Sequence, residues 1–175
     1  ATAMKAAMSG FDLRAVAQEL NAFSGAYVKK AYMPHYEQIV LRINPKDQDQ
    51  FDLVLVRGAR IYTSHRDRPM PMTPPPFAMV LRKHLKNARM TGVRQLGFDR
   101  VLAFDFDTKH GSYHLYVEVF RDGNIILTDQ EGVIIQPLTH ASYAGRTLKK
   151  GVEYQPPPPA MDPHELDVKI LTELF

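Results

Sequence analysis

The order of its periodic segments is the feature of this sequence that most limits its fold. One helix-like segment precedes four strand-like runs, and a second helix-like segment precedes five more. The expected strands lie near residues 26–32, 37–43, 51–57 and 60–64, and near 91–97, 101–107, 113–121, 124–128 and 133–136. Because helices and strands do not alternate, no βαβ unit is expected. The sequence predicts an α+β protein with two mostly antiparallel β-sheet meanders and packed helices. The order hints at a duplicated layout, although the two halves show no sequence self-similarity.

Turn and cap residues support this division. Gly58-Ala59 and Asp122-Gly123 are typical of tight hairpins between β-rich runs, and "DQEG" at 129–132 indicates another turn. The first helix is expected to begin after Ser9, with Asp12 three residues further on completing a capping box. Asp12 therefore has a structural explanation that needs no function.

The second helix carries an unusual charge pattern. Pro76 is the expected first helical residue, since proline tolerates the first turn. Four apolar residues are spaced to face the core: Phe77, Leu81, Leu85 and Ala88. Four basic residues are expected to share another face of a helix that continues through residues 82–89: Arg82, Lys83, Lys86 and Arg89. The helix contains no acidic residue, so we expect this face to contact phosphates; a merely solvated face is the alternative.

The charge of the whole chain is unevenly distributed. Residues 57–100 contain ten Arg or Lys and two Asp, a local charge of +8 in a chain of net charge +3. The remaining residues must therefore sum to −5. A basic region on a mildly acidic body is typical of proteins that bind phosphate-rich partners.

Several classes of chemistry find no support in the sequence. The chain has no cysteine, which excludes disulfides and thiolate metal sites, and no apolar run approaches the roughly 20 residues that span a bilayer. Nucleotide-binding and nucleophile motifs are absent, and His110 and His114 have no evident third ligand, so no metal or cofactor is expected. Asp105 and Asp107 could form an acid/base pair, but a solvated strand face opposite buried Phe104 and Phe106 is favoured.

Several blocks in one order resemble the N-terminal domain of the NFACT family, whose members are often described as fibronectin-binding protein A-like. The blocks are "MSGFDLRAVAQEL", "GAYVKKAY", "PPPFAMVLRKHLKNAR", "LGFDRVLAFDF", "LYVEVFRDGNIILTD" and "YQPPPP". The resemblance runs from about Met4 to the end of the chain. It implies a family domain over 4–154, a proline-rich linker over 155–161, and over 162–175 the start of a helix that leads to further domains.

The resemblance also implies a function. The family includes cytoplasmic ribosome-associated quality-control factors that engage tRNA and the large ribosomal subunit, with its rRNA and stalled peptidyl-tRNA, to support template-free tailing. The resemblance further implies a fold similar to that of the N-terminal domain of formamidopyrimidine-type DNA glycosylases. The family's tRNA-handling residues match Asp12 in "GFDLR" and Asp99 and Arg100 in "GFDR".

Three functional alternatives follow from the resemblance. The favoured one is an RNA-binding module without chemistry of its own and without a membrane partner. The second is a glycosylase-like enzyme acting on RNA or DNA, although the start "MKAAMSG" lacks the N-terminal Pro-Glu of those enzymes. The third is adhesion to extracellular matrix, which the family label suggests and the absence of a signal-peptide pattern disfavours.

Overall fold

A computed structural model describes residues 8–65, 74–96, 100–120, 123–143 and 146–156. The helices in these ranges are α1 (Gly10–Asn21) and α2 (Pro76–Leu85). The strands are β1 (Tyr27–His35), β2 (Gln38–Asn44), β3 (Phe51–Val56), β4 (Arg60–Ser64), β5 (Arg89–Gln95), β6 (Val101–Thr108), β7 (Gly111–Glu118), β8 (Ile125–Asp129), β9 (Ile134–Pro137), β10 (Ala141–Tyr143) and β11 (Arg146–Leu148). All nine expected strands are therefore present, together with a short β10–β11 pair that the sequence did not predict.

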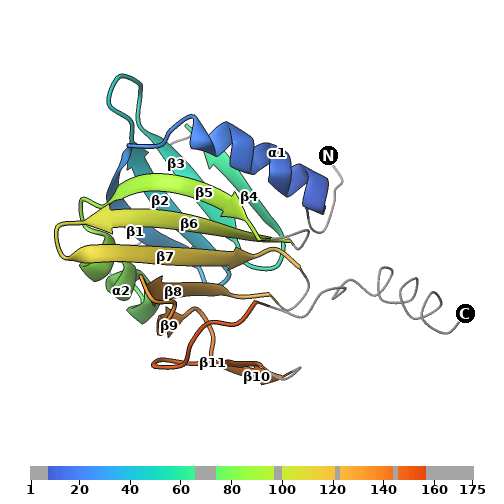
Figure 1. Cartoon of the computed structure of the whole chain (residues 1–175). Helices are drawn as coiled ribbons and strands as arrows, with labels where there is room; N and C mark the ends of the chain where they lie inside the picture. The colour runs from blue at the N-terminus through green and yellow to red at the C-terminus, as the bar shows by residue number, and fades with distance from the viewer. Residues whose placement is uncertain (1–7, 66–73, 97–99, 121–122, 144–145, 157–175) are drawn as a thin grey trace, which may run out of the picture.

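The two predicted meanders form one continuous sheet, with the order β4-β3-β2-β1-β5-β6-β7-β8-β9 (Figure 1). All of its strand pairs are antiparallel. The β1–β5 junction is brief and pairs only Tyr27 with Arg89. Around that pair, Val28 N donates to Ala88 O at 2.8 Å and Met90 N donates to Ala26 O at 2.8 Å. The expectation of two separate sheets is corrected by these bonds.

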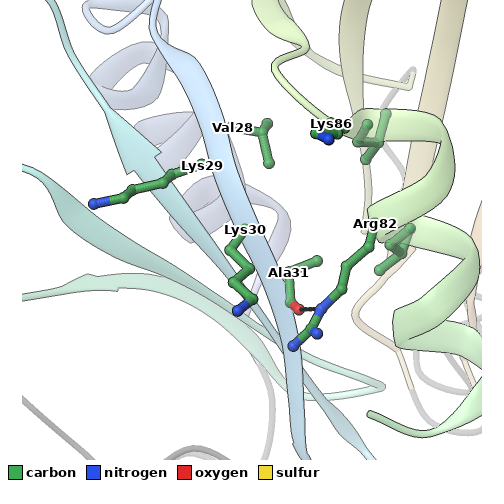
Figure 2. Close-up of a pocket in the computed structure, with 8 residues that line it drawn as sticks. Val28, Lys29, Lys30, Ala31, Arg82 and Lys86 are labelled. Carbon is green, nitrogen blue, oxygen red and sulfur yellow. Dashed lines mark hydrogen bonds between the residues drawn. The ribbon is translucent and has the colours of Figure 1, made fainter.

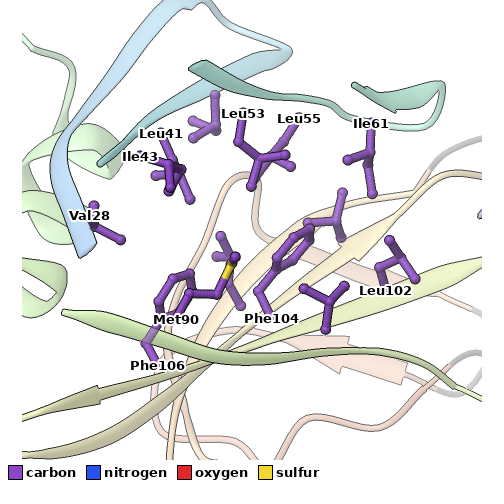
Figure 3. Packing of buried hydrophobic residues seen from close by; sticks show 14 of the residues in the cluster. Val28, Leu41, Ile43, Leu53, Leu55, Ile61, Met90, Leu102, Phe104 and Phe106 are labelled. Carbon is purple, nitrogen blue, oxygen red and sulfur yellow. The ribbon is translucent and has the colours of Figure 1, made fainter. Parts of the chain in front are cut away.

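The main core lies between the two halves of the sheet, which face each other (Figure 3). Leu41, Leu53 and Leu55 come from the first meander, and Phe104 and Phe106 come from the second. All five side chains are fully buried. The predicted inward direction of Phe104 and Phe106 is confirmed.

The helix α1, which precedes the first meander, packs mainly on β5, the first strand of the second meander. The helix α2, which precedes the second meander, packs mainly on β1, the first strand of the first. At the C-terminal end of α1, Asn21 Nδ2 donates to Val93 O on β5 at 2.8 Å, and Val93 N donates to Asn21 Oδ1 at 3.0 Å. On the other side, Arg82 Nε of α2 donates to Ala31 O on β1 at 2.7 Å. These bonds fix both helices relative to the sheet.

A buried ionic cluster attaches the last described segment to β7. Arg146 forms a two-pronged ion pair with Glu118, with Nη1–Oε2 at 2.7 Å and Nη2–Oε1 at 3.1 Å. Tyr154 Oη donates to Glu118 Oε2 at 2.8 Å. Burial and the neighbouring Glu118 carboxylate raise the pKa of Tyr154 well above its ordinary value. Most of the expected linker and all of the helix over 162–175 lie outside the described residues, so those boundaries stay predictions.

Candidate nucleic-acid interface

Asp12 lies in the first turn of α1, where it completes the predicted capping box. Its backbone N–H donates to Ser9 Oγ at 3.1 Å, and its carboxylate Oδ2 accepts from Ser9 N at 3.0 Å. The preceding residue, Phe11, is 84% exposed. The start of α1 is therefore locally rigid and presents an aromatic ring to solvent.

The start of α1 lies beside the end of β5. Gln95, the last residue of β5, donates from Nε2 to the carbonyl oxygen of Gly10 at 3.0 Å. The link that carries the Asp-Arg motif begins at the next residue, 96, and ends at Arg100. Arg100 is partly buried, and its carbonyl oxygen accepts from Val119 N at 2.9 Å. Asp99 lies outside the described residues. Asp12 and Arg100, 88 positions apart, are thus brought to one end of the molecule.

The basic residues of the second helix are arranged differently from the prediction. Pro76 does begin α2, but the helix ends at Leu85, because Lys86 is extended (ψ 121°) and Asn87 is left-handed (φ 57°). Arg89 is the first residue of β5 and lies opposite Asp107 in register. The expectation of one helical face over 82–89 was therefore wrong. The pattern misled because Ala88 is buried, although it lies beyond the helix.

The structure places Arg82 and Lys86 in a groove of about 200 Å³ between α2 and β1 (Figure 2). Its apolar walls are Val28, Ala31, Leu81 and Leu85. β1 adds Lys29 and Lys30, so the groove is lined by four cationic residues and by no acidic one. Lys83 is exposed and does not line the groove.

Three cationic side chains lie over one tyrosine ring beside the groove. Arg82, Arg42 and Lys30 lie over the ring of Tyr32, with the charged groups 5.3, 5.2 and 5.7 Å from the ring centroid. Arg42 is also paired with Asp52, with Nε–Oδ1 at 2.9 Å. The sequence analysis missed Lys30, Tyr32 and Arg42 as functional candidates. The signal that could have found them was the adjacent lysine pair of "GAYVKKAY", a strand with two exposed cations in succession.

The two groups of site residues lie at opposite ends of β5 (Figure 1). The groove lies near its first residue, Arg89, and the start of α1 lies near its last, Gln95. At about 3.3 Å per residue, the strand separates them by roughly 20 Å. The sequence order suggests that the Asp-Arg motif lies next to the basic helix, but Arg100 lies at the opposite end of β5 from the groove.

The FDFD carboxylates each have their own partners on the outer face of the sheet. Asp105 accepts from Arg94 Nε at 2.8 Å and Nη2 at 3.0 Å, and its Oδ1 lies 2.6 Å from His114 Nδ1. These bonds to Asp105 raise the pKa of Arg94. Asp107 accepts from Ser112 Oγ at 2.6 Å. The arrangement fits structural pairing across the strands better than a shared acid/base site.

Two kinds of feature are not found in the part of the chain that the structure describes. In it, no group of three or more His, Cys, Asp or Glu side chains is placed to hold a metal ion. No helix in it is long and apolar enough to cross a membrane.

The fold has close counterparts among solved structures. One is the N-terminal part of the fibronectin/fibrinogen-binding protein from Streptococcus suis, with a TM-score of 0.80 and 30% identity. The match covers 96% of this chain and 68% of that one. The N-terminal domain of fibronectin-binding protein PavA from Streptococcus pneumoniae gives a TM-score of 0.78 at 26% identity, covering 93% and 68%. The chain is thus an α+β domain of the type found at the N-terminus of these proteins.

Sequence comparison identifies the family. Residues 9–175 match the family model for NFACT N-terminal and middle domains, so the chain belongs to the NFACT family. It is 35% identical to the archaeal Rqc2 homolog aRqcH of Methanocaldococcus jannaschii and 41% identical to the human ribosome quality control complex subunit NEMF. These matches cover 98% and 77% of this chain. They span only 26% and 12% of the two relatives.

Proposed function

We propose that this chain is the RNA-binding module of a cytoplasmic ribosome quality control factor. It engages tRNA and the large ribosomal subunit, with its rRNA and stalled peptidyl-tRNA, and so supports template-free tailing of the stalled nascent chain. Membership of the NFACT family and the likeness to ribosome quality control subunits from an archaeon and from humans support the role. The chain spans only 26% and 12% of the length of these two relatives, so the activity of a whole factor is part of the proposal.

The observation that carries the proposal is the position of the start of α1, which holds Asp12, beside the end of β5. The Gln95–Gly10 hydrogen bond holds the start of α1 beside the residue from which the link departs. The start of α1 and the end of β5 thus lie side by side although they are distant in sequence, which supports a shared role for Asp12 and Arg100. A rigid helix start and a link between two sheet strands can present side chains in a defined direction.

The chemistry of these residues suits tRNA contact without catalysis. Arg100 can hold a phosphate or a base edge with two parallel donors, and a carboxylate can accept from a base amino group. Neither role needs a metal or a cofactor. Asp12, Asp99 and Arg100 act in this proposal as contact residues.

The test uses the full-length protein with Asp99→Ala and Arg100→Ala combined. We expect binding to the large subunit to persist, because other domains share it, and tRNA occupancy on those particles to collapse together with tailing. Lys109→Ala, in the exposed β6–β7 turn at the far end of β6, is the matched control and should leave occupancy unchanged. Normal tRNA occupancy in the double variant contradicts the proposal.

The glycosylase-like enzyme and the matrix-binding protein are outcomes of parallel assays. The glycosylase-like fold is an expectation from the resemblance. Base release from damaged DNA or from RNA by the wild-type chain, abolished by Asp99→Ala and Arg100→Ala, favours the enzyme. The names of the streptococcal counterparts motivate a fibronectin-binding assay.

A further inference from the structure

We propose that the groove between β1 and α2 binds the sugar-phosphate backbone of an RNA segment, at a site separate from the Asp12 and Arg100 end. The site combines Lys30 and Arg42 of the first meander with Arg82 and Lys86 from the end of α2. The inference rests on the proposed function, since it assumes that the domain binds RNA. It adds a second contact region and names the groups that form it.

The guanidinium of Arg82 is held in place before any ligand arrives. Its Nε donates to Ala31 O at 2.7 Å, and the group lies over the Tyr32 ring. Figure 2 shows its terminal nitrogens at the same end of the groove as the Lys30 amine. A fixed guanidinium loses little conformational freedom when it binds a phosphate, which favours binding.

The positive charge in this region is concentrated. Lys30 lies directly opposite Arg42 in the β1–β2 register, an arrangement of like charges that is unfavourable in a sheet. Both approach the same ring as Arg82. Asp52 is paired with Arg42. The four cations of the proposed site, Lys30, Arg42, Arg82 and Lys86, therefore carry a net charge of +3 together with this one carboxylate. A bound polyanion relieves this repulsion.

The shape of the groove favours an extended polyanion over a single small anion. Figure 2 shows the Lys86 amine and the Arg82 guanidinium at different ends of the groove, so their charges do not converge on one point. Between the cations lie the apolar surfaces of Val28, Ala31, Leu81 and Leu85, which can pack against ribose and base. A strand of RNA presents phosphates at intervals with apolar faces between them, which matches this pattern.

A β-bulge exposes two adjacent lysines of β1 beside the groove. The β1–β2 register shifts between Val28 and Lys30, so Lys29 and Lys30 are both exposed although they are adjacent. Lys29 Nζ lies 3.4 Å from Gln50 Oε1, and Figure 2 shows its amine directed away from α2. The control is Lys46→Glu, in the β2–β3 loop, because Lys46 is exposed and does not line the groove. Lys46→Glu and Lys30→Glu change the net charge of the chain equally, but only Lys30→Glu removes a cation from the groove and from the Tyr32 ring.

The experiment measures the binding of unfractionated tRNA to the 175-residue chain by fluorescence anisotropy across a salt titration. We expect Lys30→Glu to weaken binding about tenfold and to reduce the slope of log K against log salt by roughly 0.7 to 0.9, as the loss of one phosphate contact predicts. Lys46→Glu should change affinity less than about threefold. Thermal unfolding of both variants verifies that they fold, and Lys30→Gln provides a milder second variant with the same direction of effect.

Four results overturn the inference. Equal loss in both glutamate variants shows that only net charge matters. Unchanged binding in Lys30→Glu, with tRNA binding that still depends on Arg100, removes the groove while the proposed function stands. A Lys30→Glu variant that loses binding to phosphatidylserine vesicles but keeps its tRNA binding assigns the groove to a membrane surface. A wild-type chain that binds no RNA removes both proposals together.

Discussion

The two ends of β5 present different kinds of surface. The end near Gln95 is organised by backbone and capping hydrogen bonds around the start of α1, and its functional candidates lie within short contiguous motifs. The end near Arg89 is an acid-free groove made by two segments about 50 residues apart. The first suits contacts that need defined direction, and the second suits phosphate contacts that are independent of sequence.

This difference explains what could be found without a structure. The residues of a motif are contiguous in the sequence, so Asp12 and Arg100 can be recognised from the sequence alone. A groove between a helix and a strand exists only after folding, so Lys30 and Arg42 do not. The following predictions separate the two ends, in order of decreasing expected effect.

The largest effect should come from a residue that belongs to neither end. Arg146→Ala leaves the Glu118 carboxylate buried without its ion-pair partner, which we expect to cost about 3–5 kcal/mol in the free energy of unfolding. Denaturant unfolding measures the loss, with exposed Thr147→Ala as the control, expected within about 0.5 kcal/mol. RNA binding should then fail at both ends together. A stable Arg146→Ala variant contradicts the importance of this ion pair.

The next effect should distinguish two lysines near the end of the same helix. Lys86 lines the groove and Lys83 does not. Lys86→Glu should weaken RNA binding about tenfold and flatten its salt dependence, whereas Lys83→Glu should have a several-fold smaller effect. Anisotropy titrations with tRNA measure both. Equal effects would return the surface to the single basic face that the sequence predicted.

A smaller effect concerns the capping role of Asp12. Asp12→Ala removes one half of the capping box and should lower the free energy of unfolding by about 1 kcal/mol. Asp12→Asn keeps an acceptor for Ser9 N and should cost less than about 0.5 kcal/mol. Measuring tRNA association on both variants separates the roles. If association follows stability alone, Asp12 is a cap and not a contact residue.

Much of the fold followed from local patterns. Ser9 and Asp12 gave the correct start of α1, Pro76 gave the start of α2, and the alternation in "VLAFDF" gave the buried face of β6. These features depend on residues within one element, so sequence was sufficient. The turn at 129–132 was also correct, with Gly132 N donating to Asp129 O at 3.1 Å.

The errors arose where tertiary contacts override the local pattern. Ala88 is buried even though it lies beyond the helix, so its helical spacing from Leu81 and Leu85 could not reveal that α2 ends at Leu85. The bulge at Lys29 follows from pairing with β2, and the join between the meanders follows from β1 meeting β5. The short β10 and β11 have three residues each, too few for a periodic signal.

The last effect depends on pH and concerns the segment that neither end uses. The raised pKa of Tyr154 means that the folded chain holds this proton at a pH where the unfolded chain has lost it. Its contribution to stability is complete below pH 10.0 and falls as the pH rises above that value, by up to about 1.4 kcal/mol per unit. Tyr154→Phe should reduce this fall, measured by unfolding at pH 9 and pH 11 (about one unit either side of the ordinary tyrosine pKa). Tyr62→Phe, at an exposed tyrosine, is the control. A Tyr154→Phe variant that loses as much stability between the two pH values as the wild type contradicts this account.

The central claim is that this domain belongs to an RNA-binding factor, and the nucleic acid that co-purifies with the full-length protein tests it most directly. Sequencing that material should show tRNA and large-subunit rRNA enriched over total cellular RNA. We expect tRNA enrichment to fall in the Asp99→Ala, Arg100→Ala variant while large-subunit rRNA remains. Co-purified nucleic acid with the composition of total RNA, or a predominance of DNA, would contradict the account.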